Sequence, residues 1–84
     1  MSEIELKLML LRYNMLSKER ITAAYRCSQA GEDMWHDAEW SKCASEMVEM
    51  EFDLRKHGYK FTYADVKTAG GIKYDTYKIV STNN

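Results

Sequence analysis

The residues best able to bind a metal ion or attack a substrate are two cysteines and two histidines, namely Cys27, His36, Cys43 and His57. Zinc sites usually draw such ligands from close pairs, for example C-x2-C or H-x3-H, and this sequence has no such pair. If these residues lie on a helical hairpin, they are spread along it, and three of them cannot converge on one ion. We therefore predict no metal site and no cofactor.

Catalysis by a cysteine nucleophile is also disfavoured. Cys27 and His36 are the one pair that a helical hairpin would bring close together. A catalytic thiolate needs a lowered pKa and donors for an oxyanion, but Cys27 lies near the predicted C-terminus of a helix, where the dipole opposes a thiolate. Cys27 and Cys43 would lie about two helical turns apart, roughly 10 Å, which is too far for a disulfide. We predict two free, buried thiols and no enzymatic activity.

Four acidic residues follow one face of the second predicted helix, namely Glu39, Glu46, Glu49 and Asp53. The simpler interpretation is a solvated face with ion pairs to neighbouring lysines. Alternatively, a row of carboxylates can imitate a phosphate backbone and occupy a basic groove on another protein. Acid–base catalysis is disfavoured, because an exposed stripe does not desolvate one carboxylate against another. We take these four residues as candidate partner-binding residues.

Basic and aromatic residues alternate from the end of this helix into the segment that follows it. Arg55, Lys56, Lys60, Tyr63 and Tyr74 are candidate nucleic-acid-binding residues, since tyrosines can stack on bases while cations neutralise phosphates. The simpler interpretation is a pair of solvated strand faces. The net charge of −1 provides no overall attraction to nucleic acid.

A third type of site would be a small-ligand pocket at a subunit interface. Its candidate residues are Tyr25, Trp35, His36 and Trp40, which the helical hairpin would place near one end. Aromatic side chains with a few polar groups are typical of such pockets.

Apolar residues exceed what one helical hairpin needs. Leucines and methionines nearly encircle the start of the first predicted helix, and a second apolar row follows the second helix. We predict that the surplus forms the interface of a homodimer, with Leu6, Met9, Leu10, Val48 and Phe52 as interface residues. The alternative is a monomer whose layers bury all of these residues.

The elements that must position these residues are separated by glycines. We predict an α+β fold in which an antiparallel two-helix hairpin is followed by a C-terminal β-hairpin, in a single domain spanning residues 1–84. The helices cover about 2–29 and 33–57, the β-hairpin covers about 59–80, and a short tail follows.

The first helix has a stripe that we expect to face the second helix, formed by Ile4, Leu8, Leu11, Met15, Thr22 and Tyr25. Ser2 would cap its N-terminus and Gly31 would follow its C-terminus. Ile4, Leu6, Leu8 and Leu10 stand at every second position, which is also the pattern of a strand. The alternative is therefore an N-terminal strand, which would add a third strand to the sheet and give the element order βααββ.

In the second helix, a row of residues at spacings of four and three, here called the seam, predicts the buried side. Asp33 is the expected N-cap. The seam comprises His36, Trp40, Cys43, Met47, Met50, Leu54 and His57. In the β-hairpin, the apolar face of each strand changes midway, which indicates a bulge or a strong twist.

No secretory signal or membrane-spanning run is evident, and we expect a cytoplasmic protein that does not enter a membrane. We predict a small non-catalytic interaction module, homodimeric, that binds or occludes a larger partner protein. The alternatives are a nucleic-acid-binding protein and a small-ligand binder. The brevity of the chain and its lack of catalytic residues are reminiscent of accessory proteins of bacteriophages and mobile elements, including inhibitors of host defence.

Overall fold

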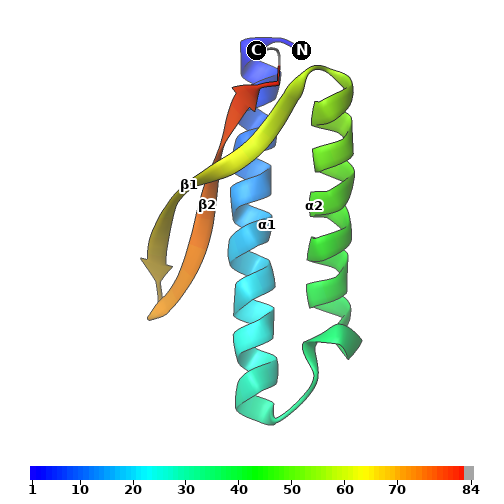
Figure 1. The fold of residues 1–84 in the computed structure, drawn as a ribbon. Helices are drawn as coiled ribbons and strands as arrows, with labels where there is room; N and C mark the ends of the chain where they lie inside the picture. Colours follow the sequence, from blue (N-terminus) through cyan, green and yellow to red (C-terminus); the bar gives the residue numbers. More distant parts are fainter. Residues whose placement is uncertain (83–84) are drawn as a thin grey trace.

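The structure, a computed structural model, describes residues 1–82 and confirms the predicted α+β fold. Two helices pack side by side in antiparallel directions, and an antiparallel β-hairpin follows them (Figure 1). The elements in chain order are α1 (Glu3–Ala30), the 3-10 turn η1 (Met34–His36), α2 (Ala38–Lys56), β1 (Tyr59–Ala69) and β2 (Ile72–Ser81).

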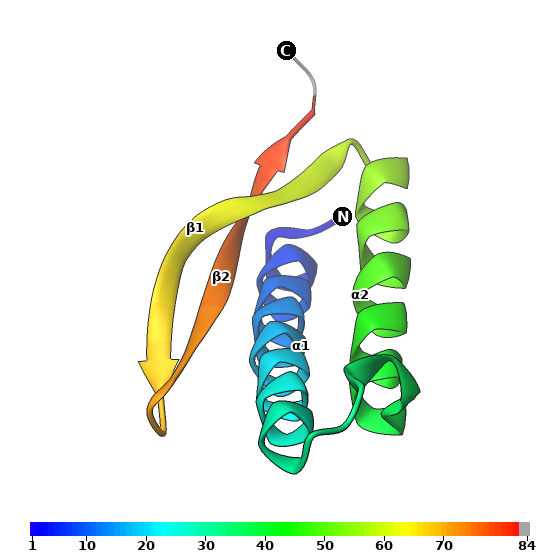
Figure 2. The ribbon, with the colours of Figure 1, turned by 60° about the horizontal axis from the view of Figure 1, so that its bottom comes forward.

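Helix α1 is the central element of the fold. Its 28 residues correspond to a length of about 42 Å at a rise of 1.5 Å per residue. The longest dimension of the molecule is 44 Å, so α1 extends along most of it. Helix α2 lies on one side of α1 and the β-hairpin on another (Figure 2).

The start and end of α1 follow from local sequence signals. The Ser2 hydroxyl accepts a hydrogen bond from the Glu5 amide at 3.2 Å, and the Glu5 carboxylate accepts one from the Ser2 amide at 3.2 Å. This capping box satisfies backbone donors that a helix start leaves unpaired. Gly31 ends the helix with φ 70°, in the left-handed conformation that favours glycine. The structure thus has a helix where an N-terminal strand was the alternative.

The second helix begins later than predicted. Asp33 caps only the short turn η1, where its side chain accepts a hydrogen bond from the Trp35 amide at 3.0 Å. Asp37 is the N-cap of α2 and accepts a hydrogen bond from the Trp40 amide at 2.9 Å. The predicted start near residue 33 was therefore wrong, because a second aspartate competes for the role of cap. His36 belongs to η1 and is exposed.

The core lies where both helices meet the hairpin. Tyr13 and Leu16 from α1 are buried against Cys43 and Met47 from α2. Phe61 from β1 and Tyr77 from β2 pack on this cluster from the hairpin side. Met50 packs on it from α2. The predicted seam of α2 is confirmed at Cys43, Met47 and Leu54, which are all buried.

The expected packing face of α1 was wrong. Ile4, Leu8, Leu11 and Met15 are between 54% and 70% exposed, and Thr22 and Tyr25 are exposed as well. The buried side of α1 is the opposite one, formed by Tyr13, Leu16, Ser17, Ala23 and Cys27. This side mixes apolar and polar residues, because it must serve both a helix and the edge of a strand.

Polar residues of α1 bind the open edge of strand β2. The Asn14 side chain accepts a hydrogen bond from the Tyr77 amide at 2.8 Å and donates one to the Tyr77 carbonyl at 3.2 Å. The Ser17 hydroxyl donates to the Asp75 carbonyl at 2.8 Å. These side chains satisfy backbone groups that a third strand would otherwise pair.

A bulge in β1 explains the change of apolar face in that strand, whereas β2 pairs without an extra residue. Tyr63 pairs with Tyr77 and Asp65 pairs with Thr76, so that Ala64 is an extra residue in β1. Every later residue of β1 therefore points to the other face relative to simple alternation. The predicted bulge is confirmed in this strand.

We predict that Asn14→Ala lowers the free energy of unfolding by about 1–3 kcal/mol, because both backbone groups of Tyr77 lose their partner. The loss should appear although alanine has the higher helix propensity. The measurement is the midpoint of urea unfolding. Gln29→Ala, an exposed change in the same helix, is the control. Equal midpoints for the two variants would contradict a role for Asn14 at the strand edge.

The N-cap of α2 predicts an acid-sensitive contribution to stability. The hydrogen bond from the Trp40 amide, and then the Arg26 guanidinium 3.0 Å away, lower the pKa of Asp37 below its ordinary value of 3.8. The ionised form is thus favoured in the folded state. The contribution should be present above pH 3.8 and should vanish as the pH falls through the lowered pKa. Asn also caps helices but does not ionise, so unfolding midpoints of wild type and Asp37→Asn should differ at neutral pH and converge in acid. A pH-independent difference would be inconsistent with this interpretation.

Candidate functional site

An open groove of about 1110 Å³ is lined by the first half of α1 and the second half of α2. It lies on the solvent side of the helix pair rather than in the core between the helices and the hairpin. Its apolar lining comes from both helices and from the residue that precedes the N-cap of α1. These apolar residues are Met1, Leu8, Met9, Met50 and Phe52.

Charged side chains form the walls of this groove. Its carboxylates are Glu5, Glu46, Glu49 and Asp53, whereas Arg12 and Lys56 are its cationic side chains. Arg12 from α1 binds Glu46 from α2 at 2.7 Å, and this contact raises the pKa of Arg12. The pair joins the two helices and neutralises one carboxylate. The three remaining carboxylates outnumber the two remaining cations, Lys56 and the amino group of Met1, which leaves the groove acidic.

The structure brings together three of the four acidic candidates. Glu46, Glu49 and Asp53 all line the groove, in keeping with the one face of α2 on which their spacing places them. Glu39 lies nearer the start of α2, where Arg26 binds it at 3.3 Å and binds Asp37 at 3.0 Å. Glu39 is thus engaged in an ion-pair network within the molecule.

Sequence reasoning missed the residues that α1 contributes to the groove. Glu5, Leu8 and Arg12 recur at spacings of three and four, a sign that they share a helix face. No feature of the sequence aligned this face with the acidic face of α2. Their alignment depends on how the two helices pack.

The predicted oligomer-interface residues divide into two groups. Val48 and Phe52 are exposed on α2, by 47% and 58% respectively. Leu6, Met9 and Leu10 are only partly exposed, and Met9 lies in the groove. These three residues offer less surface to a second copy than the exposed stripe of α1 does.

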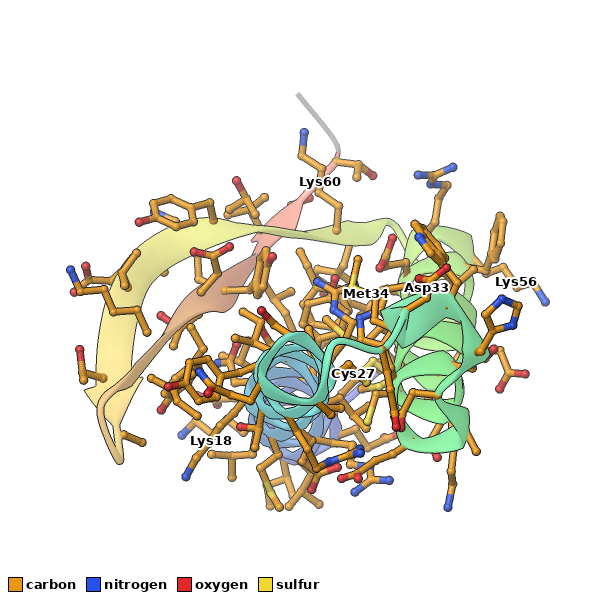
Figure 3. All side chains as sticks on the ribbon, turned by 90° about the horizontal axis from the view of Figure 1, so that it is seen from below. Lys18, Cys27, Asp33, Met34, Lys56 and Lys60 are labelled. Atoms are coloured by element: carbon orange, nitrogen blue, oxygen red, sulfur yellow. The ribbon has the colours of Figure 1, made fainter. Side chains whose placement is uncertain are left out.

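The candidate nucleic-acid residues do not form one platform. Because Tyr63 pairs with Tyr77, these two side chains share a face of the hairpin, whereas Tyr74 is three residues away and points to the opposite face. Arg55 is exposed near the end of α2. The side chains of Lys56 and Lys60 point in different directions (Figure 3).

The candidate ligand pocket is also divided. Trp35 and Trp40 contact each other edge to face, with ring centroids 4.8 Å apart, but Trp35 is 64% exposed. His36 is exposed in η1. Tyr25 is also exposed, two residues before the buried Cys27, and so points to the other side of α1.

Both cysteines are free and buried, as predicted. Burial raises the pKa of the Cys27 thiol, with Asp37 as a second cause, and burial followed by Glu19 raises that of Cys43. Among residues 1–82, no three acidic, histidine or cysteine side chains are arranged to hold a metal ion. Within the same residues, no helix is long and apolar enough to cross a membrane.

Comparison with known proteins found no matching family model, no matching curated protein and no matching solved structure.

We predict that neither thiol reacts readily in the folded protein. Cys27 and Cys43 are only 1% and 3% exposed, and their raised pKa values reduce the reactive thiolate fraction. Labelling with iodoacetamide should be slow in native buffer and fast in guanidinium chloride, with mass spectrometry counting the labels. Rapid modification of one thiol in native buffer would show that its burial is not maintained in solution.

Proposed function

We propose that this chain is a non-catalytic protein-binding module whose groove holds a cationic amphipathic helix of a larger protein. One observation carries the proposal: an apolar, methionine-rich floor lies between walls on which carboxylates outnumber cations. The four acidic residues singled out in the sequence contribute three members of these walls, Glu46, Glu49 and Asp53.

The apolar floor suits a helix with one apolar face. Two neighbouring helices present a long channel between them, and a third helix can bury its apolar residues along it. Met9 and Met50, which come from different helices, line this channel together with Phe52. Methionine side chains adapt to differently shaped partners, because they are unbranched and polarisable.

The walls select for positive charge. Arg12 is bound to Glu46. Lys56 and the amino group of Met1 then oppose three carboxylates, those of Glu5, Glu49 and Asp53. Lysines or arginines beside the apolar stripe of a bound helix would meet carboxylates on both sides of the groove. Acidic residues at the same places would be repelled, which gives the module a basis for specificity.

A designed peptide provides a direct test. The probe is an amphipathic helical peptide with leucines on one face and lysines beside them, and its matched counterpart carries glutamates in place of the lysines. We predict that the lysine peptide binds the protein, that added salt weakens the binding, and that the glutamate peptide does not bind. Isothermal titration calorimetry measures both affinities. Equal affinity for the two peptides would refute the proposal.

Two charge reversals of equal size identify the surface that binds. Glu49→Lys changes the groove wall, whereas Glu32→Lys changes an exposed acidic residue outside the groove. We expect Glu49→Lys to weaken binding of the lysine peptide by about tenfold, since one close charge contact is lost and one repulsion is gained. Glu32→Lys should leave the affinity nearly unchanged. Equal effects of the two variants would show that net charge, and not the groove, governs binding.

A further inference from the structure

A second apolar surface lies beside the groove and is distinct from it. Ile4, Leu8, Leu11 and Met15 form a stripe on α1, and their exposed fractions are 70%, 61%, 63% and 54%. Viewed along α1, helix α2 and the β-hairpin cover other sides of this helix, and one side has no other backbone over it (Figure 3). Only Leu8 also lines the groove. The other three residues have no role in the proposed function.

The spacing of this stripe is that of a coiled coil. Its members follow one another at intervals of four, three and four residues, which is the pattern of a and d positions. Lys18 occupies the next position of the pattern and points away from α2 (Figure 3). The apolar part therefore ends at Met15 and spans about 16 Å of helix. Its midpoint falls between residues 9 and 10.

We propose that this stripe is where two copies of the chain associate, with their α1 helices antiparallel and crossing at that midpoint. This arrangement sets Ile4 of one copy opposite Met15 of the other, and Leu8 opposite Leu11. Each apolar residue then meets an apolar partner, and Lys18 lies outside the contact. A two-fold axis makes the two halves of the interface identical, as in most protein dimers.

Charges beside the stripe support the antiparallel direction. Glu5 and Arg12 each follow a stripe residue, on the side of α1 that borders the groove. In the antiparallel pair, Glu5 of one copy lies near Arg12 of the other, and this happens twice. Arg12 then lies between Glu46 of its own chain, at 2.7 Å, and Glu5 of the second copy. The contact is attractive on both sides of the guanidinium.

A parallel pair has the opposite charge balance. It would place Lys7 of one copy near Arg12 of the other, at the flanking positions that meet in parallel coiled coils. It would also bring the two copies of Lys18 together at the end of the stripe. Both contacts are repulsive, so the same stripe discriminates against the parallel arrangement.

The first test measures the mass of the protein in solution. We predict that the wild type forms a dimer by sedimentation equilibrium, and that Leu11→Glu weakens the dimer by about 100-fold or more, because each dimer buries two copies of Leu11. Leu11 is exposed in the monomer, so the variant should keep its helical circular dichroism and its unfolding midpoint. Val48→Glu, an equivalent change on α2, is the control and should leave the dimer intact.

A wild type that remains monomeric at high concentration would overturn the proposal. Dissociation by Val48→Glu, with no effect of Leu11→Glu, would also overturn it and would place the interface on α2.

The second test determines the direction of the helices by cross-linking. The double variant Ile4→Cys/Met15→Cys should form an intermolecular disulfide, because the antiparallel arrangement sets these positions opposite each other. The single variant Ile4→Cys should not, because its two copies would lie about 16 Å apart along the axis. The native cysteines are buried and provide the same background in both variants. Efficient cross-linking of the single variant would overturn the antiparallel arrangement.

Both tests can fail independently of the proposed function. Leu11 does not line the groove, and Glu49 is not part of the stripe. A monomer that binds the lysine peptide would refute only the dimer. A dimer that ignores the peptide would refute only the groove.

Discussion

One aromatic side chain of α1, Tyr13, contacts helix α2 and both strands of the hairpin. Its ring stacks on Phe61 of β1 with centroids 3.6 Å apart, and it meets Tyr77 of β2 edge to face at 5.1 Å. Its hydroxyl donates to Glu51 of α2 at 2.9 Å. Burial, and then the bond to Glu51, raise the pKa of Tyr13, which keeps this donor protonated. A two-stranded hairpin is marginal alone, so its stability depends on this contact with the helices.

The central position of α1 also determines which surfaces stay open. A helix has room for neighbours on several sides, but residues 1–82 supply one other α-helix and one hairpin, which share the side around Tyr13. The side opposite Tyr13 is therefore uncovered along the length of α1. Short chains bury a smaller fraction of their surface than long ones, so a side of α1 that keeps apolar residues exposed is in keeping with the length of this chain.

Local features of the fold were predictable from sequence, whereas the orientation of α1 was not. Ser2 and Gly31 signal helix ends through contacts with near neighbours in the chain. The orientation depends on distant contacts. Two apolar stripes run along α1, and the more regular one contains Ile4 and Leu11, which are exposed. Asn14 is a half-buried polar residue of α1 whose side-chain amide takes the place of a neighbouring strand. Periodicity cannot distinguish such a residue from one that faces water.

In the candidate site, too, features of a single helix could be predicted from the sequence, whereas features that combine two helices could not. The acidic face of α2 is visible in the sequence, because Glu46, Glu49 and Asp53 lie at helical spacings. The apolar floor beneath it is not, since Met9 comes from α1 and reaches the groove only through the register of the helix pair. A net charge of −1 suggests an almost neutral molecule, yet the fold gathers carboxylates around one groove. Recognition depends mainly on charges within about 8–10 Å of the bound partner, because salt screens more distant exposed charges. Under the proposed function, the local excess of carboxylates, and not the total charge, therefore determines which partner this surface favours.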